Sequence, residues 1–243
     1  MPPVRIAMWS GPRNISTALM RAWENRPDTV VYDEPFYAHF LTATGIDHPG
    51  REEIIAADET DWRQVVERVA YAPLPPGKSI YYQKQMTHHM LEQIDLAWLG
   101  AVTNCFLLRA PAAVINSYIK VRPDVTLFDI GFAQQQRLFR LVREQSGQIP
   151  PVIDSRDVLE NPRRTLALLC NAVGVRFDER MLAWPAGPRA SDGVWAKYWY
   201  AAVEASTGFE PYRPKSQSVP PHLAGVLAEA EEIYQELYQY RLR

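Results

Sequence analysis

The stretch "VRIAMWSGPRNISTALMRAW" at residues 4–23 decides the fold class of this chain of 243 residues. Its apolar start predicts a buried strand over Val4–Trp9, and the apolar spacing that follows predicts a helix over Ile15–Asn25. That helix opens with the hydroxyls of Ser16 and Thr17. A strand, a tight turn and a helix of this kind form the usual architecture of a loop that binds phosphate or a related anion.

The turn between the two elements carries the groups that an anion needs. Gly11 and Pro12 predict a sharp turn, and Arg13 adds a permanent charge beside the free N–H groups of the helix N-terminus. The Gly-Lys pair of the P-loop signature is absent here. The alternative interpretation is an ordinary turn in which Asn14 or Ser16 caps the helix.

Apolar runs that predict buried strands alternate with helical patterns along the chain. The predicted strands are Val4–Trp9, Thr29–Tyr32, Ser79–Gln85, Val102–Leu108 and Val152–Ile153. The predicted helices are Ile15–Asn25, Asp61–Ala72, His89–Leu99, Ala112–Val121, Asp129–Gln145, Pro162–Val173 and Pro221–Tyr240. This order predicts an α/β fold, a three-layer α/β/α arrangement with a central parallel sheet of about five strands, in one domain over residues 1–243. The irregular region 176–220 is a candidate to fold over a ligand.

Composition excludes several classes of protein. Charged residues make up 22% of the chain and the net charge is −2, which argues against a broad nucleic-acid surface. No window approaches 18 uncharged apolar residues, and no apolar leader begins the chain. Cys105 and Cys170 lie in apolar and helical runs, so they predict buried thiols rather than a disulfide or zinc site. We therefore expect a cytoplasmic protein without a nucleic-acid partner, a membrane partner or a metal, and its oligomeric state stays open.

A second stretch imitates a P-loop. "APLPPGKS" at Ala72–Ser79 ends in Gly-Lys-Ser, but Ala72 stands where the first glycine belongs. The prolines of this stretch remove N–H groups that a phosphate would need, and a strand rather than a helix follows. We do not expect this stretch to bind phosphate.

Charged side chains follow successive predicted strands, at the edge where ligands of open parallel sheets bind. Arg13 follows the first strand and Glu34 the second. Lys84 lies near the end of the third, and Arg109 follows the fourth. A carboxylate suits a general base and an arginine suits a phosphate. The structural alternatives are Asp33 or Glu34 as a helix cap, a surface lysine, and an arginine that pairs with a carboxylate.

At these positions the sequence resembles the sulfotransferases that use 3′-phosphoadenosine 5′-phosphosulfate (PAPS), which have a P-loop-like fold. "PRNISTALMRAWENRPDTVVYDEP" at residues 12–35 is similar to their Arg-Ser-Gly-Thr-Thr loop and the helix after it, with Asn14 and Ile15 in place of Ser-Gly. The tyrosylprotein-type and bacterial members are the most similar, because a glutamate follows their second strand. The offset of 21 residues from Arg13 to Glu34 resembles that of the tyrosylprotein type.

Two further segments carry the resemblance. "LLRAPAAVINSY" at residues 107–118 resembles the 3′-phosphate motif, an arginine followed eight positions later by a serine. "DGVWAKYWY" at residues 192–200 faintly resembles the Gly-Asp-Trp-Lys segment that closes over the nucleotide. The resemblance is good over Val4–Phe36 and Thr103–Tyr118, and thin elsewhere.

The resemblance implies PAPS as the co-substrate and assigns residues to its parts. The 5′-phosphosulfate would be held by Gly11, Pro12, Arg13, Asn14, Ile15, Ser16 and Thr17. Arg109 and Ser117 would hold the 3′-phosphate, and Trp195 and Lys197 would close over the nucleotide.

The implied reaction is transfer of a sulfuryl group to a hydroxyl or amine of a small-molecule acceptor, in line and without a metal. Arg13 and Lys84 would stabilise the charge that develops as the donor bond breaks. We favour Glu34 as the base because of its offset from Arg13. His88, which follows Lys84 in "KQMTHH", is the rival.

Two other functions stay open on the sequence. A P-loop-type nucleotide kinase or hydrolase would need a Gly-Lys-Ser in the right place. A non-catalytic binding protein that kept only the fold is compatible with the altered loop at Asn14 and Ile15. The aromatic residues of "FYAHF" at 36–40 and of Trp195–Tyr200 line an acceptor site or, as aromatic residues more often do, pack in the core.

Overall fold

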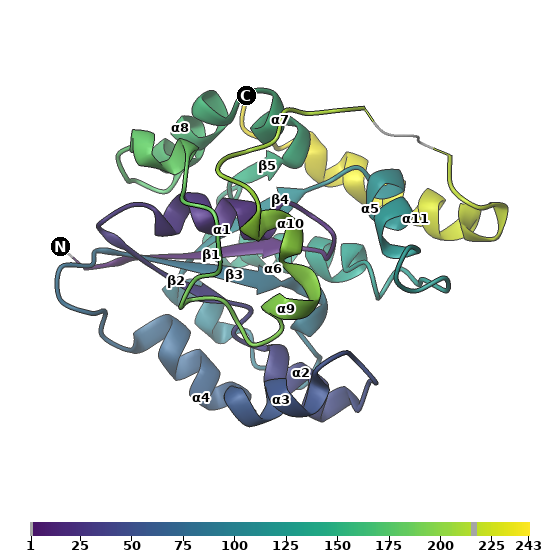
Figure 1. Cartoon of the computed structure of the whole chain (residues 1–243), viewed down its shortest axis with the longest axis horizontal. Helices are drawn as coiled ribbons and strands as arrows, with labels where there is room; N and C mark the ends of the chain where they lie inside the picture. The colour runs from purple at the N-terminus through teal and green to yellow at the C-terminus, as the bar shows by residue number, and fades with distance from the viewer. Residues whose placement is uncertain (1, 215–217) are drawn as a thin grey trace.

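The computed structural model describes residues 2–214 and 218–243, and a parallel sheet of five strands runs through its centre (Figure 1). The strands are β1 (Val4–Ser10), β2 (Thr29–Asp33), β3 (Ile80–Met86), β4 (Thr103–Leu108) and β5 (Val152–Asp154). They lie in the order β2-β3-β1-β4-β5, and every neighbouring pair is parallel. All carboxyl ends therefore meet at one edge of the sheet, where the strand order reverses beside β1.

Strand β1 explains why the sheet is buried on both faces. Ile6 and Met8 face one apolar cluster, and Ala7 and Trp9 face another, because successive side chains of a strand alternate. All of them have no solvent exposure. A strand that is buried on both faces has a continuous apolar sequence, and this is the pattern that predicted it.

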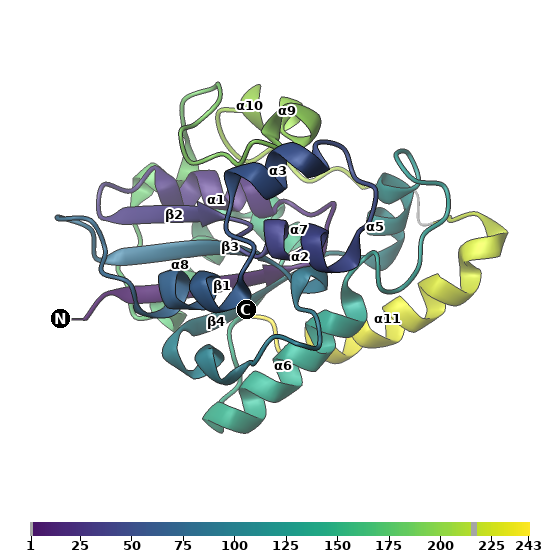
Figure 2. The same cartoon turned by 90° about the horizontal axis from the view of Figure 1, so that it is seen from below.

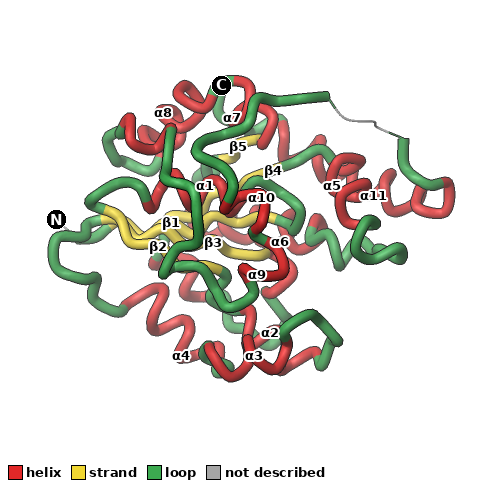
Figure 3. Tube along the Cα trace, viewed as in Figure 1, coloured by secondary structure: helices red, strands yellow, loops and turns green. Residues whose placement is uncertain are grey.

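Helices cover both faces of the sheet, and Figure 3 shows them on either side of the strands. On the face of Ile6 and Met8 lie α1 (Ser16–Glu24), α7 (Ser155–Glu160) and α8 (Pro162–Ala172). On the face of Ala7 and Trp9 lie α4 (Trp62–Val66), α5 (Pro111–Tyr118), α6 (Phe132–Ser146) and α11 (Ala224–Tyr238). The predicted three-layer α/β/α arrangement with five parallel strands is confirmed.

A third apolar cluster joins segments that are distant in the sequence. The helices concerned are α2 (Tyr37–Thr44), α3 (Arg51–Ala57), α9 (Ala196–Trp199) and α10 (Ala201–Glu204). Side chains of α2 and α3 pack against Trp195 and Tyr200, and Figure 2 shows α3, α9 and α10 together on one side of the sheet. The part of the region 176–220 around Trp195 and Tyr200 thus packs beside the carboxyl ends of β2 and β3, and residues 215–217 lie outside the described residues.

The predicted helix over His89–Leu99 is wrong. Its backbone is non-helical between two short 3₁₀ turns, Thr87–His89 and Ala97–Ala101. Met90, Ile94 and Trp98 are buried at a spacing of four residues, which imitates the apolar stripe of a helix although a loop supplies them.

The other predicted strands and helices are confirmed, with small shifts at their ends. The second half of the helix predicted over Asp61–Ala72 is a π-helical turn, Glu67–Tyr71. The sequence pattern does not predict α2, α3 or α7. In α2 five consecutive residues from Tyr37 to Leu41 are buried, so this helix shows no polar face that would reveal its period.

Both cysteines are free and buried, as the composition predicts. Burial raises the pKa of the Cys170 thiol to about 11, so this thiol stays protonated at neutral pH. None of the helices in the described part of the chain is long and apolar enough to cross a membrane.

Candidate active site

Gly11 begins the loop after β1, and a close approach of the backbone requires a glycine there. A Cβ atom on Gly11 would lie 2.4 Å from the carbonyl oxygen of Ile130. The facing Gly131 has a φ of 72°, and a Cβ there would meet Thr87 Oγ1 at 2.5 Å. Gly11 therefore serves the packing of the loop, and it is not among the residues that line the cavity described below.

Arg13 carries the backbone strain of the loop. Its φ is 57°, in the left-handed region, whereas Ile15 has an ordinary φ of −90°. Asn14 ties the loop to β4, because its Nδ2 donates to the Leu107 carbonyl at 3.2 Å while its Oδ1 accepts the Ile15 N–H at 2.8 Å. The loop thus accommodates Asn14 and Ile15, since neither has to adopt a positive φ.

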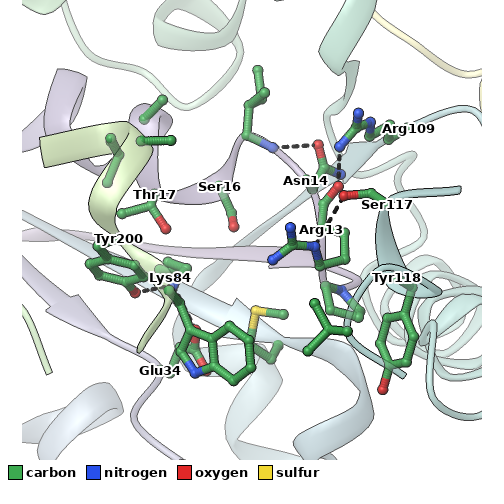
Figure 4. A pocket seen from close by; sticks show the side chains of 18 of the residues that line it. Arg13, Asn14, Ser16, Thr17, Glu34, Lys84, Arg109, Ser117, Tyr118 and Tyr200 are labelled. Carbon is green, nitrogen blue, oxygen red and sulfur yellow. Dashed lines mark hydrogen bonds and ion pairs between the residues drawn. The ribbon is translucent and has the colours of Figure 1, made fainter. Parts of the chain in front are cut away.

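The N-terminus of α1 faces the loop without a side-chain cap. Its N-cap residue is Ile15, and no side chain of the described residues bonds the first-turn N–H groups. The alternative of Ser16 as the cap is therefore wrong, and Asn14 binds the Ile15 N–H just before the helix. Ser16 and Thr17 line the cavity instead, and Figure 4 shows their side chains in the same space as Arg13 and Lys84. Uncapped first-turn N–H groups suit an anion.

Two arginines lie next to each other at the ends of β1 and β4. Arg13 Nε donates to Ser117 Oγ at 3.1 Å, and the Arg109 guanidinium donates to the Arg13 carbonyl oxygen (Figure 4). Neither forms an ion pair with a carboxylate of the described residues, so the paired-arginine alternative for Arg109 is not found. Burial and the charge of Arg13 lower the pKa of Arg109 below its ordinary value. An anionic ligand would neutralise both guanidinium groups.

Lys84 is buried among carboxylates at the ends of β2 and β3. Its Nζ lies 2.6 Å from Glu34 Oε1 and 2.9 Å from Asp33 Oδ1, and its side chain is 2% exposed. The surface-lysine alternative is therefore wrong. Burial alone would lower the pKa of Lys84, but the two carboxylates outweigh burial and hold this pKa well above its ordinary value. Lys84 is a fixed cation of the cavity wall.

Glu34 is the second residue with a positive φ among the described non-glycine residues, at 43°. It does not cap α2, whose N-cap is Phe36 without a side-chain bond, so that alternative is wrong. Burial raises the pKa of Glu34, and the Asp33 carboxylate adds to this, while Lys84 opposes it; the net shift is upward. A carboxylate with a raised pKa is a stronger base than an exposed one. Strained residues cluster at active sites, and Arg13 and Glu34 both line this cavity.

His88 and His89 follow β3 and lie in the same cavity. Burial lowers the pKa of His88 to about 4, and the charge of His48 adds to this effect. His88 Nδ1 is buried and has no hydrogen-bond partner within the part of the chain that the structure describes. His89 Nε2 lies 4.0 Å from Glu34 Oε2. Both candidate bases, Glu34 and His88, therefore line the cavity.

Sequence reasoning missed the roles of Asp33 and Tyr200. Asp33 is a buried carboxylate that accepts from Lys84 Nζ and, at 2.6 Å, from the Tyr200 hydroxyl. The Gly193 N–H also reaches Asp33 Oδ2, at 3.4 Å. Because Tyr200 lies far along the chain, only a contact map would have revealed this cluster.

Trp195 and Lys197 do not reach the cavity. Trp195 is 1% exposed in the third apolar cluster, where its Nε1 donates to the Tyr200 hydroxyl at 3.2 Å. Lys197 is 54% exposed and pairs with Glu53 of α3 at 2.5 Å. Farther along the same region, Trp199, Tyr200 and Val203 line the cavity instead. Neither Trp195 nor Lys197 is among the residues that line the cavity.

One cavity of about 530 Å³ brings together the predicted site residues other than Gly11, Trp195 and Lys197. The loop residues Pro12 to Thr17 line this cavity with Arg109 and Ser117, and so do aromatic residues that include Tyr37, Phe40, Tyr118 and Trp199. Glu34, Lys84 and Tyr200 also line it. This volume suits a drug-sized ligand. Within residues 2–214 and 218–243, no three His, Cys, Asp or Glu side chains are grouped to hold a metal ion.

Solved sulfotransferase structures share this fold. The sulfotransferase domain of the Synechococcus PCC 7002 olefin synthase superposes with a TM-score of 0.62 at 15% identity, covering 100% of this chain and 96% of that one. The sulfotransferase domain of the curacin biosynthetic pathway gives a TM-score of 0.53 at 18% identity, with 99% of both chains covered. At such identities the likeness concerns the fold.

Two proteins of Arabidopsis thaliana are similar in sequence. They are named branched-chain-amino-acid aminotransferase-like proteins 1 and 2, and they are 36% and 33% identical over 207 and 216 residues. The matches cover 85% and 88% of this chain, which spans only 37% and 38% of these relatives. A family model described as the sulfotransferase domain matches residues 4–233. The chain therefore belongs to the sulfotransferase domain family.

Proposed function

We propose that this chain transfers a sulfuryl group from PAPS to a hydroxyl or amine of a small-molecule acceptor. The observation that carries the proposal is the pair Arg13 and Arg109, which lie together without a carboxylate partner among the described residues. They share a cavity with the buried Glu34 and Lys84. The names of the plant relatives do not bear on this proposal, because the match covers less than two fifths of those proteins.

The donor would bind along the cavity wall that the loop forms. The first-turn N–H groups of α1, with Arg13, Ser16 and Thr17, suit the 5′-phosphosulfate. Arg109 and Ser117 suit the 3′-phosphate, because a guanidinium offers a fork of donors to phosphate oxygens. Ser117 already accepts from Arg13 at 3.1 Å, so one hydrogen bond links the groups that serve the two ends of the donor.

The chemistry would use Glu34 and Lys84 in complementary roles. Glu34 accepts the acceptor's proton as the acceptor oxygen or nitrogen forms its bond to sulfur. The bond between sulfur and the bridging oxygen breaks, and Lys84 and Arg13 stabilise the negative charge that remains on the 5′-phosphate of 3′,5′-ADP. In-line placement supplies much of the rate, as in phosphoryl transfer. His88 is the alternative base.

Isothermal titration with 3′,5′-ADP tests the donor site directly. We expect binding without added Mg²⁺, and transfer of ³⁵S from labelled PAPS to members of a panel of phenols and alcohols. Tight binding of ATP with Mg²⁺ and no binding of 3′,5′-ADP would support the P-loop kinase or hydrolase instead. Binding of 3′,5′-ADP with no labelled product across the panel would favour a non-catalytic binding protein.

A further inference from the structure

Besides the anion loop, the cavity has apolar walls that can enclose the acceptor. Phe40, Met86 and Trp199 contribute apolar surface there. The ring of Phe40 stacks on His89 at 4.8 Å and meets the edge of His88 at 5.4 Å, so this wall is held by ring contacts. Both histidines are neutral at pH 7 because burial lowers their pKa. The body of a fitting acceptor is therefore apolar or aromatic.

Arg122 also lines the cavity, and it is a further permanent charge there besides Arg13, Lys84 and Arg109. Its Nη2 donates to the backbone carbonyl of Asp47 at 2.8 Å. Burial raises the pKa of Tyr118, and the nearby charge of Arg122 opposes this. The Asp129 carboxylate accepts hydrogen bonds from the backbone N–H and the hydroxyl of Thr126, at 2.8 and 2.6 Å, so it has partners other than Arg122. No carboxylate within the described residues forms an ion pair with Arg122. A guanidinium has five N–H donors, so donors remain for a ligand.

Glu34 marks the reacting end of the enclosure. Lys84 holds its Oε1 at 2.6 Å. The other oxygen, Oε2, lies 4.0 Å from His89 Nε2, beyond hydrogen-bond distance. An acceptor hydroxyl can therefore donate to Oε2 without displacing Lys84.

We infer that the acceptor is a hydroxy acid, with its hydroxyl at Glu34, its apolar body beside Phe40 and Trp199, and its carboxylate on Arg122. The inference rests on the proposed function and names its substrate class. A carboxylate is costly to bury unless it is paired, and Arg122 offers the pair. A neutral acceptor of the same shape would leave this guanidinium without its anion.

Matched pairs of small molecules test the inference. The probes are 3-(4-hydroxyphenyl)propionate and its carboxamide, and 6-hydroxyhexanoate and its carboxamide, titrated calorimetrically in saturating 3′,5′-ADP. We expect at least one acid to bind about tenfold or more tightly than its amide, the usual scale of a charge-assisted contact. Arg122→Gln should abolish this difference and leave the affinity for the amide unchanged. Arg122→Lys should keep part of it, and Arg63→Gln, on the exposed face of α4, should keep all of it.

Three results would overturn the inference. They are equal or tighter binding of both amides, no binding of any probe, and an equal loss of acid and amide affinity in Arg122→Gln. The last would mean that Arg122 only holds the 45–50 loop through Asp47. A separate titration of 3′,5′-ADP reports on the proposed function. If that nucleotide does not bind, the donor assignment fails. The affinities of the acids and amides can then still be compared by titration without nucleotide.

Discussion

The Tyr200 hydroxyl donates to Asp33 Oδ2 at 2.6 Å, across 167 positions of the sequence. Lys84 Nζ bonds both of these residues, and Trp195 Nε1 donates to the same hydroxyl. This contact fastens the segment around α9 to the ends of β2 and β3. It also fixes the ammonium group that faces Glu34, so the wall of the cavity depends on a buried hydrogen-bond network.

Tyr200→Phe should destabilise the chain by about 1–3 kcal/mol, because it removes the hydroxyl that Asp33, Lys84 and Trp195 share and leaves buried polar groups without a partner. Urea unfolding measures this loss. Tyr71→Phe is the matched control, since Tyr71 is 55% exposed, and it should change the unfolding free energy by less than about 0.5 kcal/mol. Equal effects of the two substitutions would show that the network contributes no stability.

Arg109→Ala should weaken binding of 3′,5′-ADP by about 2–4 kcal/mol, because a buried, charge-assisted contact to the 3′-phosphate is lost. Adenosine 5′-phosphosulfate lacks that phosphate, so its affinity should fall much less. Calorimetric titration of both ligands gives the comparison. Arg140→Ala is the control, because Arg140 is 60% exposed and pairs with Glu236. Equal losses for both ligands would assign another role to Arg109.

Glu34→Gln should lower turnover by about 10²-fold or more and leave the affinity for 3′,5′-ADP nearly unchanged, because only the proton acceptor is removed. His88→Asn should have a milder effect, and Lys84→Ala a severe one. In the wild type, activity should fall as the pH drops through the raised pKa of Glu34, since the protonated carboxyl is no base. Initial rates with labelled PAPS across pH provide the measurement. Loss of transfer in His88→Asn with an active Glu34→Gln would reverse the two roles.

Asp154 should make stability depend on pH. Burial raises the pKa of Asp154 from 3.8 to about 6, although the Arg156 N–H and the Tyr234 hydroxyl oppose this. The folded chain therefore holds the proton more tightly than the unfolded chain, and stability falls as the pH rises from about 4 to about 6.

The substitution Asp154→Asn isolates this effect. As the pH rises through this window, the unfolding free energy of the variant should increase relative to that of the wild type, by at most about 1.4 kcal/mol per pH unit. Contributions of other groups, such as His88, are common to both proteins and cancel in the difference. A difference that does not vary between pH 4 and 6 would contradict the assignment.

Gly11→Ala should destabilise the chain by about 1–3 kcal/mol, because its Cβ would lie 2.4 Å from the Ile130 carbonyl oxygen and the loop would have to move. Affinity for 3′,5′-ADP should fall as well, since the same loop holds Arg13. Gly100→Ala is the control, because no atom of the described residues lies within 4 Å of a Cβ at that position. Urea unfolding and calorimetry report the two effects. Normal stability and affinity in Gly11→Ala would show that the backbone yields without cost.

The sequence by itself determined the α/β class, the five strands and the charged residues at their ends. These follow from local causes: buried parallel strands are continuous apolar runs, and turns and helix starts have their own residue preferences. Arg13, Glu34, Lys84 and Arg109 line one cavity because parallel strands end at one edge of the sheet. The general geometry of parallel sheets is therefore enough to predict that these four residues lie close together.

Tertiary structure alone decided which neighbouring side chain faces the cavity. Asp33 and Glu34 are adjacent in sequence, yet Asp33 is bound to Tyr200, and Glu34, with its φ of 43°, lines the cavity. Trp195 is buried in a core and Lys197 lies on the surface because α9 packs against α2 and α3. Such burial depends on contacts between segments that are far apart in the chain, and local residue patterns do not encode those contacts.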